Sequence, residues 1–202
     1  MSFFSRSMDQ SNPDADLVKA YLRGDDDALR FLYERHIPGV FNFISRLAPP
    51  ELDAEDIVQD AFIKAWRSLN RFDQSRSFKT WLFTIAKNTL LDRVKAKKSI
   101  PFSFLDSADG ESPSNIEPVD GQPLPDAALQ LLESDKAASD LLDKLDPGKR
   151  AVVVMHVLED LSFRQIGEVL GEPMDTVKTR YRRAIQALSK HLKDMPGTNN
   201  LG

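Results

Sequence analysis

Hydrophobic residues recur at helical spacing over two stretches of the chain, and neither stretch shows the alternation that indicates a strand. In the first stretch, glycine or proline interrupts the period at Gly24, Pro38 and Pro49. We therefore expect helices at about residues 14–24, 26–36, 38–47, 53–69 and 77–98. In the second stretch, Val152–Met155 could form a strand, but no turn residues bound it, and we favour a buried helix.

A segment rich in proline and acidic residues separates the two stretches. Residues 101–125 contain five prolines, and residues 101–135 contain eight acidic residues and no lysine or arginine. A segment of this composition buries too little apolar surface to offset the entropy lost on ordering. The sequence therefore predicts an all-α protein with two small helical domains, at residues 12–98 and 127–195, joined by a long flexible acidic linker at 99–126.

The charge of the chain is sorted into blocks. The net charge is −4, but the acidic segment alone accounts for −8, so the remainder carries +4. Residues 176–193 hold six basic residues and no acid, which favours an anionic partner for that segment. The chain has no cysteine and no apolar run near the ~20 residues that span a bilayer, and its first residues lack the apolar core and cleavage site of a signal peptide. We expect a cytoplasmic protein without membrane insertion.

A helix-turn-helix pattern occupies residues 161–180. Ser162 is placed to cap a short amphipathic helix, Gly171 supplies the turn, and Pro173 starts a longer helix. The longer helix carries polar and basic side chains opposite an apolar stripe, as does a helix that enters a DNA major groove. The alternative is an amphipathic helical hairpin whose basic face is only solvated.

The first domain has two polar surfaces. On the helix expected at 53–69, one outward face carries Asp56, Gln59, Asp60 and Ile63. This face suits a docking surface for a basic protein partner, but an ordinary solvated face would look the same. The polar loop at 70–77 and the next helix offer cations for phosphates and amides for an unstacked base, or again a solvated face.

Two pairs of motifs, in this order, carry a family resemblance. The first pair is DAEDIVQDAFIKAW at residues 53–66 and FKTWLFTIAKNTLLDR at residues 78–93. The second is LDPGKR at residues 145–150 and the helix-turn-helix pattern. The first pair resembles region 2 of the bacterial sigma-70 family of RNA polymerase sigma factors, and the second resembles region 4. A linker in place of a region 3 domain is similar to the extracytoplasmic-function (ECF) group.

The resemblance, which covers nearly the whole chain, implies roles for named residues. Those implied to dock on the coiled coil of the polymerase β′ subunit are Asp56, Gln59, Asp60, Phe62 and Ile63. Those implied to meet the −10 element and capture its flipped base are Asn70, Arg71, Gln74, Ser75, Arg76, Lys79, Lys87, Asn88 and Arg93. Those implied to contact the −35 element are Asp175, Thr176, Lys178, Thr179, Arg180, Arg182 and Arg183.

The resemblance also implies the function and partners. A sigma factor binds the polymerase core (β′ and β subunits) and promoter DNA, directs initiation from −35 and −10 elements, and is commonly held inactive by an anti-sigma factor. It needs no catalytic residue, cofactor or metal, because base flipping costs a few kcal/mol that binding groups offset.

Two features depart from the family pattern. Asp175 stands where a small residue is usual. Its carboxylate either interacts favourably with the positive end of the helix dipole or accepts a hydrogen bond from a cytosine amino group. The acidic linker either threads the polymerase cleft as a nucleic-acid mimic or is a solvated tether.

The sequence disfavours three other classes of function. An enzyme is disfavoured because the three histidines are scattered and the sequence has no phosphate loop or zinc-ligand spacing; His156 suits a core position. A helix-turn-helix regulator would bind a palindromic operator by itself and would not need the outward face at 56–63. A pure interaction protein would leave the basic helix after Pro173 unexplained.

Overall fold

The computed structural model describes residues 14–97 and 135–194, and within them every regular element is helical. The first part contains α1 (Asp14–Leu22), α2 (Asp26–Leu47), α3 (Ala54–Ser68), the short 3-10 turn η1 (Leu69–Arg71) and α4 (Phe78–Ala96). The second contains α6 (Asp135–Leu142), α7 (Pro147–Val153), the π-helical turn η2 (Val154–Leu158), α8 (Phe163–Leu170) and α9 (Met174–Asp194). The all-α prediction with two helical domains is confirmed, whereas the linker predicted at 99–126 lies outside the described residues.

Helix α2 runs through Pro38, so the predicted break between residues 36 and 38 is wrong. Proline removes one main-chain donor and disfavours the helix interior. The buried side chains Leu32, His36, Val40 and Phe43 nevertheless follow one another at helical spacing on both sides of Pro38. A break at Pro38 would rotate the buried side chains on one side of it away from the core. The packing of these side chains therefore keeps the helix continuous.

The first domain is built around α2, which packs against α1, α3 and α4. Asp14 fixes α1 to α2, because its carboxylate lies 2.8 Å from His36 Nε2 and 2.8 Å from Arg35 Nη1. Burial raises the pKa of Asp14, but the hydrogen bonds and charges of His36 and Arg35 outweigh burial, and the pKa is lowered. The aromatic rings of Phe43 and Phe83, 5.3 Å apart, join α2 to α4 in the same core.

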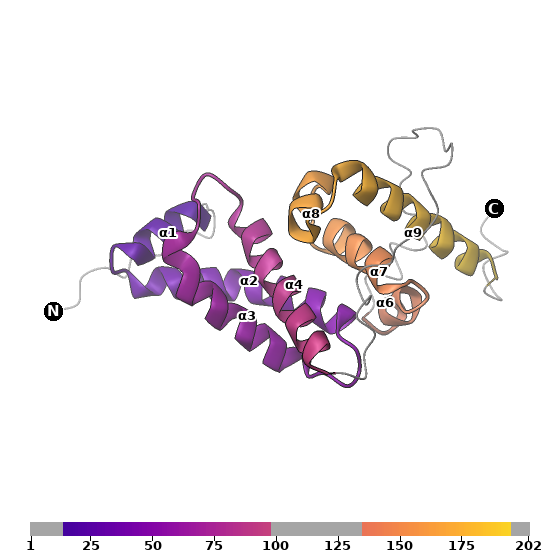
Figure 1. The fold of residues 1–202 in the computed structure, drawn as a ribbon, viewed down its shortest axis with the longest axis horizontal. Helices are drawn as coiled ribbons and strands as arrows, with labels where there is room; N and C mark the ends of the chain where they lie inside the picture. Colours follow the sequence, from indigo (N-terminus) through magenta and orange to yellow (C-terminus); the bar gives the residue numbers. More distant parts are fainter. Residues whose placement is uncertain (1–13, 98–134, 195–202) are drawn as a thin grey trace.

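The second domain packs α7 and α8 against α9, and it lies directly beside the first domain (Figure 1). Helix α8 contacts α4, and α7 and η2 contact α2. The segment Val152–Met155, an ambiguous strand in the sequence, is fully buried and spans the end of α7 and the start of η2, so its helical interpretation is confirmed. Helix α4 is therefore covered on one side by its own domain and on another by α8.

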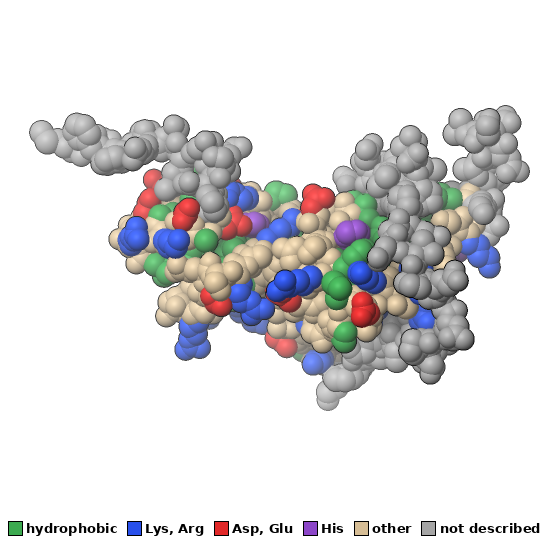
Figure 2. All heavy atoms as spheres, turned by 90° about the horizontal axis from the view of Figure 1, so that it is seen from above, with side chains coloured by type: hydrophobic (Ala, Val, Ile, Leu, Met, Phe, Trp, Pro, Cys, Tyr) green, Lys and Arg blue, Asp and Glu red, His purple; other side chains and the backbone are tan. Residues whose placement is uncertain are grey.

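Charged side chains of both signs reach the surface of the described residues. Lysine and arginine side chains lie among aspartate and glutamate on the face shown in Figure 2. The large hydrophobic side chains that are exposed among these residues are Leu22, Tyr33, Phe41, Ile63 and Met174. None of the helices in residues 14–97 and 135–194 combines the length and the apolar character needed to cross a bilayer.

The turn between α8 and α9 requires a close approach at Gly167. A β-carbon at Gly167 would lie 2.7 Å from the main-chain oxygen of Glu172. Because that oxygen belongs to the backbone of the turn, we predict that Gly167→Ala destabilises the second domain by about 1–3 kcal/mol, although alanine is the better helix former. Thermal unfolding followed by circular dichroism measures the change, and an unchanged or raised melting temperature would contradict it.

Candidate protein and nucleic-acid interface

Helix α3 presents the outward face that the sequence predicts. Asp53 caps the helix by accepting hydrogen bonds from the main-chain nitrogens of Glu55 (2.8 Å) and Asp56 (3.4 Å). Beyond this cap, Asp56, Gln59 and Ile63 are exposed, and Ile63 retains 46% of its accessible surface. An apolar side chain flanked by an amide and a carboxylate suits the centre and rim of a protein interface.

Phe62 does not lie on this face. Its side chain is 3% exposed and packs edge-on against Tyr33, with ring centroids 4.9 Å apart, and against Trp66 at 5.5 Å. Its implied direct contact with polymerase is therefore inconsistent with the structure, because the helical period turns position 62 into the core. Phe62 supports the face from below, and the half-exposed Tyr33 extends that face onto α2. No motif in the sequence singles out Tyr33.

The loop between η1 and α4 borders a pocket of about 260 Å³. The residues that line it are Arg71, Phe72, Asp73, Arg76, Ser77, Thr80, Trp81, Thr84 and, from α8, Glu168. The ring centroids of Phe72 and Trp81 lie 5.0 Å apart, and the two rings form the aromatic wall of the pocket. The pocket thus combines aromatic surface, hydroxyl groups and cations, which are the groups that hold an unstacked base and its phosphate.

Local hydrogen bonds fix the shape of this loop. Asp73 accepts from the Ser75 hydroxyl at 2.7 Å and from the Ser75 main-chain nitrogen at 3.0 Å, and these bonds lower the pKa of Asp73. Ser77 then caps α4 by accepting from the Thr80 nitrogen at 3.3 Å. The predicted residues are all exposed, Asn70 and Arg71 in η1 and Gln74, Ser75 and Arg76 in the loop. Trp81, which the helical period assigns to the apolar stripe, is half-buried and borders the pocket.

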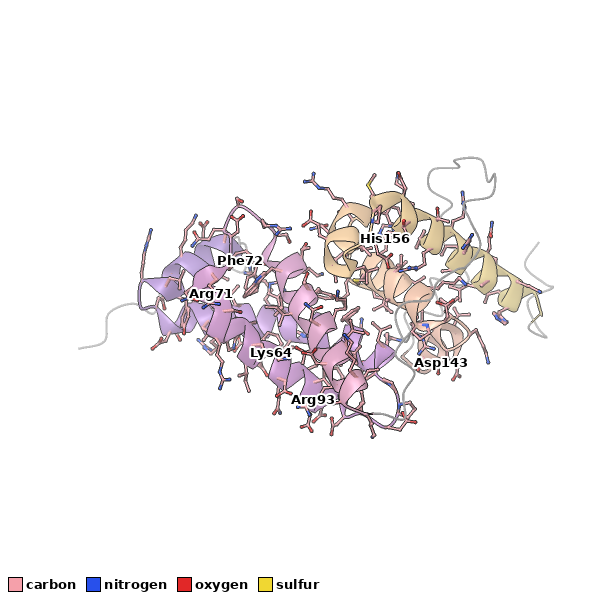
Figure 3. All side chains as sticks on the ribbon, in the orientation of Figure 1. Lys64, Arg71, Phe72, Arg93, Asp143 and His156 are labelled. Carbon is pink, nitrogen blue, oxygen red and sulfur yellow. The ribbon has the colours of Figure 1, made fainter. Side chains whose placement is uncertain are left out.

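The structure does not bring all predicted residues of α4 to one face. Lys79 and Asn88 are nine residues apart, which is about 180° around a helix. Asn88 is exposed, whereas Lys79 points toward the second domain and pairs there with Glu159. Lys87 is half-buried. Arg71 and Phe72 lie near one end of α4 and Arg93 near the other (Figure 3).

Arg93 joins the predicted DNA-binding surface to the predicted docking surface. Its Nε lies 3.0 Å from Asp60 Oδ2, and its Nη2 contacts the same oxygen. The hydrogen bond and the charge of Asp60 raise the pKa of Arg93. A residue predicted to contact polymerase and a residue predicted to contact DNA are thus ion-paired across α3 and α4.

The second domain contains the helix-turn-helix that the sequence predicts. Ser162 and Gln165 form a reciprocal capping box at the start of α8, with Ser162 Oγ accepting from the Gln165 nitrogen at 3.3 Å. Gly171 ends the helix in the left-handed region, at φ 76°. The nitrogens of Gly171 and Glu172 both donate to the Gly167 oxygen, at 2.8 and 2.9 Å, so the turn into α9 is closed by hydrogen bonds.

An aromatic cluster holds α9 against this turn. His156 stacks on Phe163 at 4.2 Å and meets Tyr181 edge-on at 4.9 Å, and burial raises the pKa of the Tyr181 hydroxyl. His156 Nδ1 also lies 2.9 Å from the Leu161 oxygen. His156 therefore has the satisfied contacts expected of a core histidine, but its side chain is half-buried, so the predicted core position is only partly reached; Figure 3 labels it on the second domain.

Arg180 differs from the other residues predicted to contact the −35 element. It is 7% exposed, and its Nη1 lies 3.0 Å from Glu172 Oε1 and 2.9 Å from Glu172 Oε2. The structure thus turns Arg180 inward, where it fixes the turn to α9, and we no longer place it among the DNA contacts. Asp175 and Thr176 are exposed, and four further predicted residues are half-exposed: Lys178, Thr179, Arg182 and Arg183.

Comparisons with known proteins agree with the two motifs. The model of Sigma-70 region 2 matches residues 32–100, and that of Sigma-70, region 4 matches residues 135–188. The ECF RNA polymerase sigma factor SigW of Bacillus subtilis is 35% identical over 182 residues, which cover 88% of this chain and 96% of SigW.

Solved structures of similar proteins include sigma factors in complexes. The structure of CnrH in complex with the cytosolic domain of CnrY has a TM-score of 0.64 at 28% identity and covers 92% of this chain and 100% of that one. The sigma factor RpoE with the anti-sigma factor NepR, from Bartonella quintana, has a TM-score of 0.59 at 23% identity and covers 81% and 96%, which supports the fold alone. The chain belongs to the extracytoplasmic-function group of the sigma-70 family, and it is a sigma factor that binds core RNA polymerase and directs promoter-specific initiation of transcription.

Proposed function

We propose that this sigma factor binds polymerase and the two promoter elements through three separate surfaces, and that it has no catalytic chemistry of its own. The outer face of α3 docks on polymerase, the η1–α4 loop and the outer side of α4 bind the −10 element, and α9 reads the −35 element. We assign the first two to a domain at residues 12–98 and the third to a domain at 127–195, with the linker at 99–126 between them. The protein would act in the cytoplasm, where polymerase and promoters are.

The observation that carries this proposal is the geometry of α9. Its apolar side packs on α7 and α8, and its first turns project from the glycine turn with Thr176, Thr179 and Arg182 at the surface. Hydroxyl and guanidinium groups in the first turns of such a helix are the groups that contact base edges and phosphates in a major groove. The basic stretch of residues 176–193 adds a field that attracts DNA.

The docking face gives a test with a matched control. Ile63 and Leu22 have nearly the same exposure, 46% and 45%, but Leu22 lies on α1, away from the proposed face. We predict that Ile63→Ala weakens binding to core polymerase about tenfold, since removing a central apolar contact costs more than ~1 kcal/mol. Leu22→Ala should leave core binding unchanged. Equal effects of the two variants, measured by competition for core polymerase, would contradict the assignment.

Two neighbouring arginines of α9 give opposite predictions. Arg182→Ala should change the −35 sequences selected from a promoter library, at a loss of about 1–3 kcal/mol. Arg180→Ala leaves the partly buried Glu172 carboxylate unpaired, so it should destabilise the domain by about 2–3 kcal/mol.

Run-off transcription with core polymerase and sequencing of the selected promoters measures the first effect, and calorimetry measures the second. A changed −35 preference in a folded Arg180→Ala protein, with none in Arg182→Ala, would reverse the roles assigned to the two residues.

Control by an anti-sigma factor is the remaining part of the proposal. CnrH is similar to this chain in sequence and fold, and its solved structure is a complex with the cytosolic domain of CnrY. The solved structure of RpoE is a complex with the anti-sigma factor NepR. We propose that a partner of this kind covers the docking and DNA surfaces of this chain. Because the chain has no cysteine, a thiol switch within it is excluded.

A further inference from the structure

Asp175 lies at the centre of the polar face of α9. The helix begins at Met174, so Asp175 is its second residue, and the side chain of Asp175 is exposed. At about 100° per residue, Asp175 lies about 40° around the helix from Thr179 and about 20° from Arg182. The buried Val177 lies about 160° away, on the opposite side of the helix. A carboxylate therefore stands among the residues that we assign to the −35 element.

The start of α9 is held by groups other than the carboxylate of Asp175. The Pro173 oxygen accepts a hydrogen bond from the Val177 nitrogen at 3.2 Å and so closes the first turn of the helix. The Glu172 carboxylate holds Arg180, with Oε2 at 2.9 Å from Nη1. Asp175 adds a favourable interaction with the helix dipole, but that interaction requires only a negative charge and is independent of the DNA sequence. The turn thus places the carboxylate at the surface without using it as a support.

An ionised carboxylate only accepts hydrogen bonds, and this property discriminates among the four bases. In the major groove, guanine presents two acceptors, and thymine presents an acceptor beside its methyl group, so neither can donate to a carboxylate. Adenine presents an amino donor with a ring nitrogen acceptor next to it, which repels the second carboxylate oxygen. Cytosine presents an amino donor alone. A carboxylate on the reading face of α9 therefore favours cytosine.

The charge of Asp175 also weakens binding to DNA that lacks this base. Phosphates repel a carboxylate, and a carboxylate that faces guanine or thymine loses hydration without gaining a hydrogen bond. Such penalties against the wrong partner increase specificity as much as good contacts with the right one. The six basic residues in 176–193 supply the general attraction to DNA that offsets the repulsion. Asp175 therefore lowers the overall affinity of α9 for DNA and raises its discrimination.

We propose that Asp175 is a specificity-determining residue of this sigma factor, and that it selects a C·G base pair in the −35 element by accepting a hydrogen bond from the cytosine amino group. The proposal rests on the function given above to α9 as the helix that reads the −35 element. Asparagine has the same size as aspartate but pairs with adenine, because it offers one donor and one acceptor. Asp175→Asn should therefore change the preferred base as well as weaken the original preference.

The first test selects −35 sequences with the complete holoenzyme. Core polymerase and the full chain initiate transcription from a promoter library that is randomised over the −35 element, and sequencing of the productive promoters gives the base preference at each position. Asp175→Asn replaces the carboxylate by an amide of the same size. The control, Asp140→Asn, makes the same replacement at an exposed position of α6, outside the helix-turn-helix.

We expect one position of the −35 element at which the parent protein and the control prefer a C·G pair by about tenfold, the discrimination typical of one good base contact. With Asp175→Asn, the preference at this position should change from cytosine to adenine, and the other positions should keep their preferred bases. Circular dichroism checks that each variant is folded. An unchanged cytosine preference in folded Asp175→Asn, or a parent protein that prefers no C·G pair in this element, would overturn the proposal.

The second test removes the amino group of the base instead of the carboxylate. The base 2-pyrimidinone, placed at the selected cytosine, keeps the ring and lacks the amino group. Holoenzymes with the parent chain or with Asp175→Ala are bound to promoter duplexes with either base, and the four affinities form a double-mutant cycle. We expect the base exchange to weaken binding by the parent about tenfold more than binding by Asp175→Ala. Equal losses for the two proteins would show that the carboxylate does not bond to the amino group.

Arg182→Ala separates failure of this proposal from failure of the function proposed for α9. If Arg182→Ala and the parent select the same −35 sequences, α9 does not read this element, and the role of Asp175 is wrong with it. If Arg182→Ala changes the selected sequences and Asp175→Asn does not, only the role of Asp175 is wrong.

Discussion

Helix α4 is packed on two sides, by α2 and α3 of its own domain and by α8 of the other, and the arrangement of the functional surfaces follows from this double packing. A helix with two buried sides has little polar surface left, so its polar residues cannot all face one ligand. Asn88 faces solvent, Lys79 faces Glu159, and Arg93 reaches α3. The surface of the first domain that we assign to −10 DNA is therefore formed by the η1–α4 loop together with α4, and α8 of the second domain packs beside it.

The surfaces assigned to polymerase and to DNA are physically connected. Asp60 on the docking helix holds Arg93, and α8, which begins the helix-turn-helix, holds Arg76 through Glu168. A partner that draws Asp60 into an interface would free Arg93, and a partner that moves α8 would free Arg76. We infer from this connection that the chain binds promoters weakly until polymerase has bound, since Arg76 and Arg93, which we assign to −10 DNA, are already paired with carboxylates.

The sequence predicts the helices well because their signals are local. Asp53, Ser77 and Ser162 each cap a helix where the pattern places its start, and Gly171 has the left-handed backbone that the turn requires. The break predicted at Pro38 is wrong, because a stripe of buried side chains continues across this residue and keeps α2 in one piece. Phe62 and Arg180 fall inside motifs whose exposed members we assign to polymerase and to DNA. The helical period already turns Phe62 toward the core and Tyr33, whereas only the pairing with Glu172 shows that Arg180 is buried. The pairs of Glu159 and Glu168 with the first domain join residues about 80 and 92 positions apart, and no periodicity or motif encodes such contacts.

We propose that this chain opens promoter DNA only as part of a polymerase complex, with α9 on the −35 element and the η1–α4 pocket on the −10 element. Permanganate footprinting of promoter fragments recovered from a genomic library tests it most directly, because permanganate oxidises unpaired thymines. The account predicts reactive thymines at the −10 position when both core polymerase and this protein are present, together with protection upstream at −35, and no reactivity with either alone. Stable protection of duplex DNA by the protein alone, with no reactive thymines after core polymerase is added, would contradict the account and indicate an operator-binding regulator.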